Sequence, residues 1–220
     1  MRLKLLIHII IGILLIVGCS TEDKKGVNND RSSSVKPMVL KAGVYEAIND
    51  SSKILWECEW LGGAKHDGDV QLVSGFVDIS ETSNVSGKFI VNLNSMSCYD
   101  LKNKFTNQKL ISHLKSDDFF DVENYPEAVL DLLSSHNIAG NEYKFMGNLT
   151  IKGRTHSIIF TGTVKEQKLS YETNLKLIFD RSKYDVRYRS ASLFSDLGDR
   201  IIADDVKLTV KAKFKRDSKI

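Results

Sequence analysis

The sequence contains little of what marks a linker-rich or nucleic-acid-binding protein. It has only 2 prolines among 220 residues, which excludes long proline-rich linkers. The formal net charge is +3, and Lys and Arg form no run long enough to predict a surface for polyanions. We therefore expect no nucleic-acid partner. With 42% hydrophobic and 27% charged residues, the chain is long enough for one globular domain with a sizeable core.

Recognisable catalytic and metal-binding motifs are also missing. No Gly-x-Ser-x-Gly nucleophile motif is present. Asp117, Asp118 and Asp121 are interpreted as solvated carboxylates, because adjacent side chains on a capped turn diverge and would not act together as acid and base. No two of the histidines beyond residue 18 have a spacing such as His-x-x-x-His; they are His66, His113, His136 and His156. We expect no enzyme, no cofactor and no metal, although distant segments could still assemble a metal site.

The N-terminal apolar run, residues 5–17, is too short for an ordinary transmembrane helix. It follows the basic residues Arg2 and Lys4, as the hydrophobic region of a signal peptide does. Gly18 directly before Cys19 resembles a bacterial lipobox. We predict that residues 1–18 are a lipoprotein signal peptide and that Cys19 is acylated, which would anchor the protein stably to a membrane. A generic secretory signal with a chance cysteine is the alternative.

Residues 19–39 are polar and rich in Ser, Asn and Asp, without apolar periodicity, and are predicted to be a flexible tether. The folded domain is then residues 40–220. Ser20 does not resemble the aspartate that retains some lipoproteins at the inner membrane. The predicted location is the bacterial cell envelope, lipid-anchored to the outer membrane and facing the periplasm.

From about residue 40 onward, apolar and polar residues alternate, which predicts strands with one apolar and one wet face. In residues 54–60, for example, Ile54, Trp56 and Cys58 share a face with Trp60. The same alternation occurs in residues 143–151, 158–164, 171–179 and 206–214. Turn signals lie at residues 67–68, 140–141 and 152–153. Many evenly spaced antiparallel strands predict an all-β barrel or sandwich.

One segment has helical periodicity. Leu110, Ile111 and Leu114 fit one face of a helix over residues 101–115. Ser116 is predicted to cap a short turn that begins with two aspartates. Phe119 and Phe120 can then point to the apolar interior, so that the segment forms a lid.

Four segments together resemble the YceI-like family: residues 113–128 (HLKSDDFFDVENYPEA), 147–153 (GNLTIKG), 180–188 (DRSKYDVRY) and 197–210 (LGDRIIADDVKLTV). The resemblance implies an antiparallel closed barrel of about eight strands, lipocalin-like, with a short helical lid between strands. It also implies an apolar cavity that holds a long amphiphile such as an isoprenoid or a quinone. Without the resemblance, a core filled by side chains is the default for a barrel of this size.

A hollow barrel makes the inward residues of the strands and the lid candidates for ligand binding: Trp56, Phe89, Val91, Phe119, Phe120, Phe145, Leu149, Phe160, Leu175, Leu177, Leu208 and Val210. The head-group candidates are His66, Arg181 and Tyr184. For His66 we favour a hydrogen bond that braces a turn. Arg181 belongs to a basic and aromatic cluster with Tyr184, Arg187, Tyr188 and Arg189. For this cluster we favour salt bridges at the rim over a head-group clamp, with the neighbouring acids Asp180, Asp185, Asp199 and Asp204 as partners.

Cys58 and Cys98 could form a disulfide in an oxidising compartment, but two buried thiols are the favoured interpretation. The predicted function is a lipid-anchored envelope protein that binds or carries an isoprenoid, quinone or similar amphiphile. The alternative is a non-catalytic envelope structural or stress-related interaction module with a filled core. The sequence leaves open whether the protein forms a homodimer.

Overall fold

The computed structural model describes residues 36–168, 170–194, 196 and 198–217. The predicted signal peptide, Cys19 and most of the predicted tether lie outside this range, so those predictions stay untested. Within the described residues, no helix has the length and hydropathy needed to cross a membrane.

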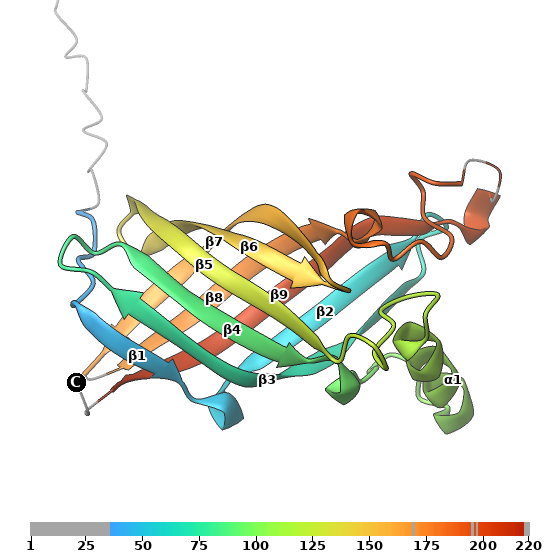
Figure 1. Ribbon diagram of the computed structural model, residues 1–220, viewed down its shortest axis with the longest axis horizontal. Helices are drawn as coiled ribbons and strands as arrows, with labels where there is room; N and C mark the ends of the chain where they lie inside the picture. The colour runs from blue at the N-terminus through green and yellow to red at the C-terminus, as the bar shows by residue number, and fades with distance from the viewer. Residues whose placement is uncertain (1–35, 169, 195, 197, 218–220) are drawn as a thin grey trace, which may run out of the picture. The chain divides into compact units, whose positions relative to one another are not determined.

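Nine strands and one α-helix make up the described chain (Figure 1). The strands are β1 (Gly43–Ala47), β2 (Lys53–Trp60), β3 (Lys65–Ile79), β4 (Val85–Asn92), β5 (Glu127–Ala139), β6 (Glu142–Ile151), β7 (Arg154–Gln167), β8 (Ser170–Asp180) and β9 (Ile202–Arg216). The helix α1 (Lys104–Lys115) follows β4. Short 3-10 turns are η1 (Asn49–Ser51), η2 (Leu93–Ser95), η3 (Arg181–Tyr184) and η4 (Gly198–Arg200).

The strands form one closed antiparallel barrel. Their order is β1-β3-β2-β9-β8-β7-β6-β5-β4, and pairing of β3 with β4 closes the sheet. Both β1 and β2 pair with β3 on one side and with β9 on the other. They therefore occupy the same position in the barrel, one after the other, with η1 as the break between them. The barrel has eight positions and one extra strand, which confirms the predicted fold class.

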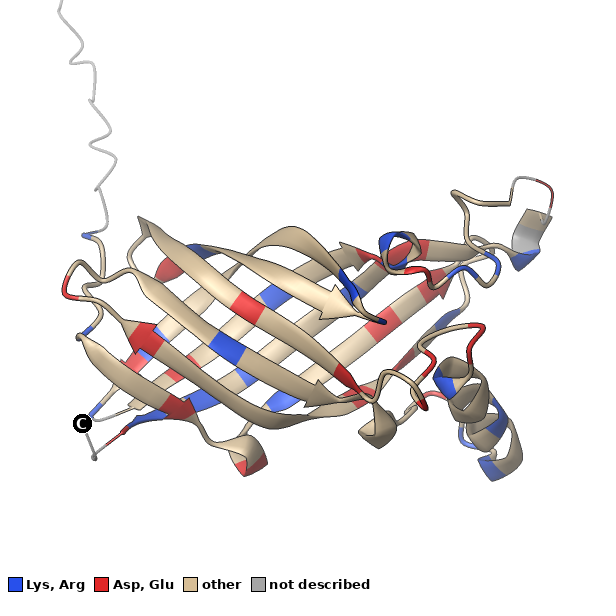
Figure 2. Ribbon diagram, viewed as in Figure 1, with Lys and Arg blue, Asp and Glu red and all other residues tan. Residues whose placement is uncertain are grey.

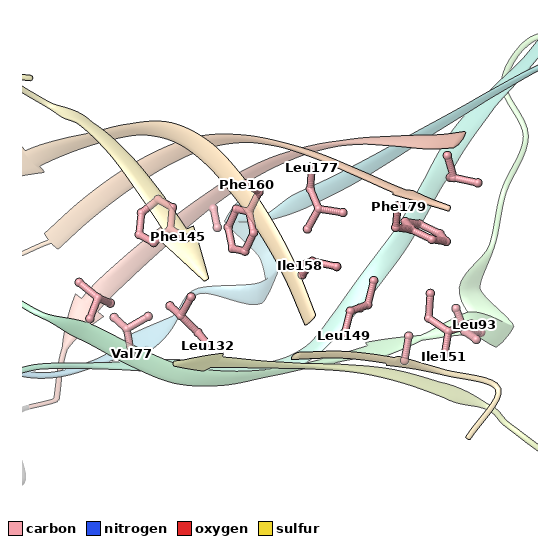
Figure 3. Packing of buried hydrophobic residues seen from close by; sticks show 14 of the residues in the cluster. Val77, Leu93, Leu132, Phe145, Leu149, Ile151, Ile158, Phe160, Leu177 and Phe179 are labelled. Atoms are coloured by element: carbon pink, nitrogen blue, oxygen red, sulfur yellow. The ribbon is translucent and has the colours of Figure 1, made fainter. Parts of the chain in front are cut away.

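Alternation along each strand decides which side chains face inward. In β6, every second residue from Tyr143 to Ile151 is buried, as the period-2 pattern predicts. Figure 3 shows Phe145, Phe160 and Leu177, from three neighbouring strands, in the same interior. Along the strands, Lys and Arg positions are interspersed with Asp and Glu positions (Figure 2).

The helix begins three residues later than predicted. Asn103 is its N-cap, with the side-chain oxygen accepting hydrogen bonds from Phe105 N at 3.0 Å and Thr106 N at 3.1 Å. The predicted cap at Ser116 is wrong, because the Ser116 hydroxyl instead donates to the carbonyl of His113 at 2.8 Å. The turn after α1 is held by backbone hydrogen bonds, such as Asp121 N to Ser116 O at 2.8 Å.

Two of the three predicted turns are confirmed, and one is wrong. Residues 140–141 and 152–153 join β5 to β6 and β6 to β7. Lys152 and Gly153 have φ values of 51° and 69°, as a tight hairpin requires. Residues 67–68 instead lie inside β3. Gly68 is needed there for another reason: a Cβ atom on it would lie 1.8 Å from the carbonyl oxygen of Ser97, which packs against the strand.

Candidate functional site

The barrel encloses a cavity of about 220 Å³. Its lining comes from all eight barrel positions, and it extends from Leu40 and Tyr171 near one end to Phe179 and Phe119 near the other. From Tyr171 to Phe179 the strand β8 rises roughly 26 Å, at about 3.3 Å per residue. Among the described lining residues, Arg181 is the one that carries a charge. The cavity is therefore a long apolar space with a single cation at one end.

All the predicted ligand-binding residues line this cavity: Trp56, Phe89, Val91, Phe119, Phe120, Phe145, Leu149, Phe160, Leu175, Leu177, Leu208 and Val210. Sequence reasoning missed lining residues that alternation in the quoted segments does not mark. Leu40 precedes the first strand, Met96 lies in the loop before α1, and Leu114 was assigned to the helix but not to the cavity. Whether any of these residues binds a ligand is a prediction.

The lid closes one end of the barrel with aromatic rings. Phe119 is 6% exposed, and its ring lies 4.9 Å from that of His113 and 5.2 Å from that of Tyr188. His113 Nε2 lies 3.0 Å from Asp118 Oδ2 on the outer side. Phe119 and Phe120 thus face the cavity, while Asp118 stays exposed. This is the arrangement that the interleaved Asp and Phe residues predicted.

Lys152 fastens the lid to the barrel, a role that sequence reasoning missed. From the β6–β7 hairpin its ammonium donates to the carbonyls of Asp117 at 2.8 Å, Phe119 at 3.1 Å and Asp185 at 3.2 Å. One side chain therefore ties the turn after α1 to the loop after η3. A lysine in a Lys-Gly turn gives no sign of this in the sequence, because the carbonyls that it reaches are 33 to 35 residues away.

Arg181 is buried, which corrects the expected surface salt bridge. The residue is 1% exposed, and its guanidinium donates to the carbonyls of Ala203 at 3.1 Å, Val186 at 2.9 Å and Ile202 at 3.0 Å. Burial lowers the pKa of this group. Asp204 lies 3.5 Å away and provides the opposite charge. Arg181 therefore joins the end of β8 to the start of β9 beside the cavity, with its guanidinium nitrogens turned to these carbonyls.

The acids near Arg181 have separate roles. Burial acts to raise the pKa of Asp204, but hydrogen bonds from Ser190 and Ser192 and the nearby Arg181 charge lower it overall. Asp180 caps η3 by accepting from Ser182 N at 2.9 Å. Asp185 pairs with Arg187 and with Arg154 at the surface. The predicted surface pairing thus holds for Asp185, while the Asp199 side chain lies outside the described set.

The other two head-group candidates lie outside the described cavity lining. His66 lies in β3, and its Nδ1 is 2.8 Å from Asp100 Oδ2. The bond braces a loop against a strand, not the turn that was predicted. Tyr184 is 1% exposed and packs against Phe179 and His156. Its hydroxyl has no hydrogen-bond partner among the described residues, and burial raises its pKa to about 12.

Tyrosines close the opposite end of the barrel. Tyr143 Oη donates to the carbonyl of Met38 at 2.6 Å. Tyr45 Oη donates to the carbonyl of Lys41 at 3.1 Å, and Tyr171 Oη accepts from Lys41 N at 2.9 Å. Burial raises the pKa of Tyr171 to about 12. The segment before β1 is therefore held across this end by hydroxyl groups.

Of the cysteines in the described part of the chain, Cys58 and Cys98 are both free thiols. Cys58 lines the cavity, and Cys98 lies in the loop before α1. Burial raises the pKa of both thiols, and the neighbouring Asp100 raises that of Cys98 further. Neither thiol is activated as a nucleophile.

An antiparallel barrel with eight positions, an apolar interior and a helical lid defines a lipocalin-like protein. Residues 45–214 match the YceI-like domain, and the chain belongs to the YceI-like family.

Solved structures agree on the fold. BcnA from Burkholderia cenocepacia is 21% identical with a TM-score of 0.59, over 74% of this chain and 96% of BcnA. A polyisoprenoid binding domain from Saccharophagus degradans, implicated in plant cell wall breakdown, is 10% identical with a TM-score of 0.57, over 79% of this chain and 98% of that domain. No curated protein sequence matches the chain significantly.

Proposed function

We propose that the protein binds and carries a long-chain apolar amphiphile, such as an isoprenoid or a quinone, inside its barrel. The observation that carries the proposal is the cavity of about 220 Å³, whose lining is apolar apart from a few groups near its ends. The structural neighbour described as a polyisoprenoid binding domain supports it. A tail that loses about 300 Å² of surface gains on the order of 7 kcal/mol before ordering costs. No polar chemistry is needed for that gain.

The proposal includes attachment of the protein to a membrane. The predicted acylation of Cys19 would attach the protein to a membrane of the bacterial cell envelope, with the outer membrane as the proposed site. The barrel would then take its ligand from one membrane or enzyme and release it to another. We propose no catalytic step, in keeping with apolar walls and thiols whose pKa values are raised.

The polar end of the ligand is proposed to lie at the lid end, beside Arg181. The guanidinium is the one charge among the described lining residues. At the other end, the hydroxyl of Tyr171 already accepts a hydrogen bond from the backbone amide of Lys41. A ligand with a spin label on its polar end should broaden the methyl NMR signals of Leu114 and leave those of Leu40 sharp. The reverse pattern would place the head group at the tyrosine end.

The test of binding uses delipidated full-length protein and a radiolabelled polyisoprenoid or quinone. Saturable retention of about one molecule per chain is expected. Leu177→Trp fills the cavity and should abolish retention, because Leu177 is buried and lines it. Ile178→Trp is the matched control, since the next residue of β8 is 54% exposed on the outer face. No saturable retention of any long-chain amphiphile, or equal retention by both variants, would refute the proposal.

A further inference from the structure

Three potential metal ligands meet at the rim of the barrel near the lid, where His66 shares the inward face of β3 with Val70 and Leu72. His66 comes from β3, whereas Cys98 and Asp100 come from the loop between η2 and α1. One ligand atom from each lies within 4.8 Å of the other two. More than 30 residues separate His66 from Cys98 along the chain, so spacing in the sequence could not predict the cluster. None of these atoms is part of the cavity.

The backbone holds the three side chains in place without any ligand. Ser97 N donates to Asp69 O at 3.0 Å, and Tyr99 N donates to Asp67 O at 2.7 Å, so the loop runs along β3 like a short extra strand. Asp67 N donates to Asp100 Oδ1 at 3.1 Å. Gly68 allows this close approach, because any larger residue would collide with the carbonyl of Ser97.

Asn107 of α1 adds a further support from the helix side. Its side-chain amide donates to the carbonyls of Cys98 and Leu101, at 2.9 Å each. The loop is therefore fixed between a strand and a helix, which is the support that a metal site requires from its surroundings.

The donor set suits a zinc-like ion. Imidazole nitrogen, thiolate sulfur and carboxylate oxygen are the ligands of Zn²⁺ in proteins, and three such ligands leave a fourth position for water. His66 Nδ1 lies 2.8 Å from Asp100 Oδ2, and Cys98 Sγ lies 3.1 Å from Asp100 Oδ1. A tetrahedral ion with bonds of about 2.0–2.3 Å spaces its ligands roughly 3.3–3.8 Å apart. Binding thus needs the two distances to Asp100 to lengthen by roughly half an ångström and the His66–Cys98 separation, which is at most 4.8 Å, to close by up to about 1.3 Å.

The exposure of the cluster fits an open site. Cys98 is 8% exposed, whereas the His66 and Asp100 side chains are each 25% exposed. An ion can therefore enter from solvent and rest on the buried sulfur.

We propose that His66, Cys98 and Asp100 bind one divalent transition-metal ion of the zinc class, with water as the fourth ligand. As the metal–sulfur bond forms, the Cys98 thiol releases its proton to solvent. The His66 proton moves through solvent from Nδ1 to Nε2, which frees Nδ1 to bind the ion, and the hydrogen bonds of Asp100 to both partners are replaced by bonds to the ion. Because α1 begins a few residues after Asp100 and Met96 lines the cavity, the ion would fasten the base of the lid.

The test uses reduced, metal-free full-length protein in a Cys19→Ser background, titrated with Co²⁺. A thiolate-to-cobalt charge-transfer band and visible bands of tetrahedral intensity are expected, saturating at one equivalent and disappearing when Zn²⁺ is added. Cys98→Ser should abolish the charge-transfer band. Cys58→Ser is the matched control and should keep it: Cys58 is the cross-strand neighbour of His66, but its thiol donates to Ala203 O at 3.7 Å and is not one of the three clustered ligands.

Two further variants guard against a folding defect in Cys98→Ser. His66→Gln and Asp100→Asn keep the size of each side chain and should weaken Co²⁺ binding by at least about 100-fold, since even outer partners of a metal ligand contribute about 10–100-fold. No thiolate band in the parent protein, or equal binding by all variants, would overturn the site. Retention of amphiphile is measured separately, so failure of the metal site leaves the proposed function standing.

Discussion

The two ends of the barrel are closed by different chemistry. At one end, tyrosine hydroxyls hold the segment before β1 through neutral hydrogen bonds to its backbone. At the other end, two cations hold the closure. Lys152 donates to two carbonyls of the lid and one of the loop after η3, and buried Arg181 donates to one carbonyl after η3 and two at the start of β9. Hydrogen bonds from charged donors are individually stronger, but a buried cation is costly if any of its partners is lost.

The lid end is thus held by charged donors and the opposite end by neutral hydroxyl groups. A closure built on an ion can be changed by a ligand that approaches the ion, whereas neutral hydroxyl bonds offer a ligand little to bind. We therefore propose the end with Arg181 as the end at which an amphiphile enters and leaves.

The largest effect is expected from Arg181→Ala. It leaves three backbone carbonyls without their donor and the partly buried Asp204 without its opposite charge, which should lower the free energy of unfolding by about 3–5 kcal/mol. Urea denaturation followed by circular dichroism measures this. Arg187→Ala removes an exposed pair with Asp185 and should cost less than about 1 kcal/mol. If the two variants were equally stable, Arg181 would not be a structural cation.

Alkaline pH should weaken both ends. Tyr171 and Tyr184 have pKa values raised from 10 to about 12 by burial, so the folded state keeps both phenols protonated when the unfolded chain has begun to ionise. The stability that they contribute is present in full below pH 10 and is lost as the pH rises towards 12. Urea midpoints measured across this range should fall, and Tyr171→Phe should reduce the steepness of the fall. An unchanged slope in that variant would assign the loss to other groups.

The smallest expected effects are changes in stability that differ in sign between the two ends of the barrel. Tyr143→Phe removes the bond to Met38 O and should destabilise the protein by about 1 kcal/mol. Tyr184→Phe removes a buried hydroxyl without a partner among the described residues, so it should leave stability unchanged or raise it slightly. Thermal unfolding of the two variants side by side tests the pair. Equal destabilisation would mean that Tyr184 Oη binds an ordered water.

Much of the barrel could be predicted from the sequence, because period-2 alternation is a local property. The inward orientation of Tyr143, Phe145 and Leu149 can be read from the alternation within one strand. The orientation of Phe119 and Phe120 can be read from the residues of one turn. Once the strands close into a barrel, this pattern predicts which residues line the cavity. The helix could be placed approximately, but its start depended on the Asn103 cap, which the apolar periodicity does not mark.

Contacts between distant segments could not be predicted. Arg181 looks like a surface residue in a charged stretch, and only the return of β9 beside β8 buries it. Gly68 follows an aspartate and therefore resembles a turn, yet its role is to admit Ser97 from another loop. The same loop brings Cys98 to His66. In each case the deciding partner is more than 20 residues away, where a local pattern carries no information.

The position of the chain ends has a practical result for handling the protein. Met38 is bonded to Gly140 and Tyr143, and Asp217 N is bonded to Val44 O, so both ends of the described chain emerge beside the tyrosines and opposite α1 (Figure 1). A purification tag, a fluorophore or a sensor surface joined directly at residue 36 or residue 217 would therefore be attached at the end of the barrel opposite the lid.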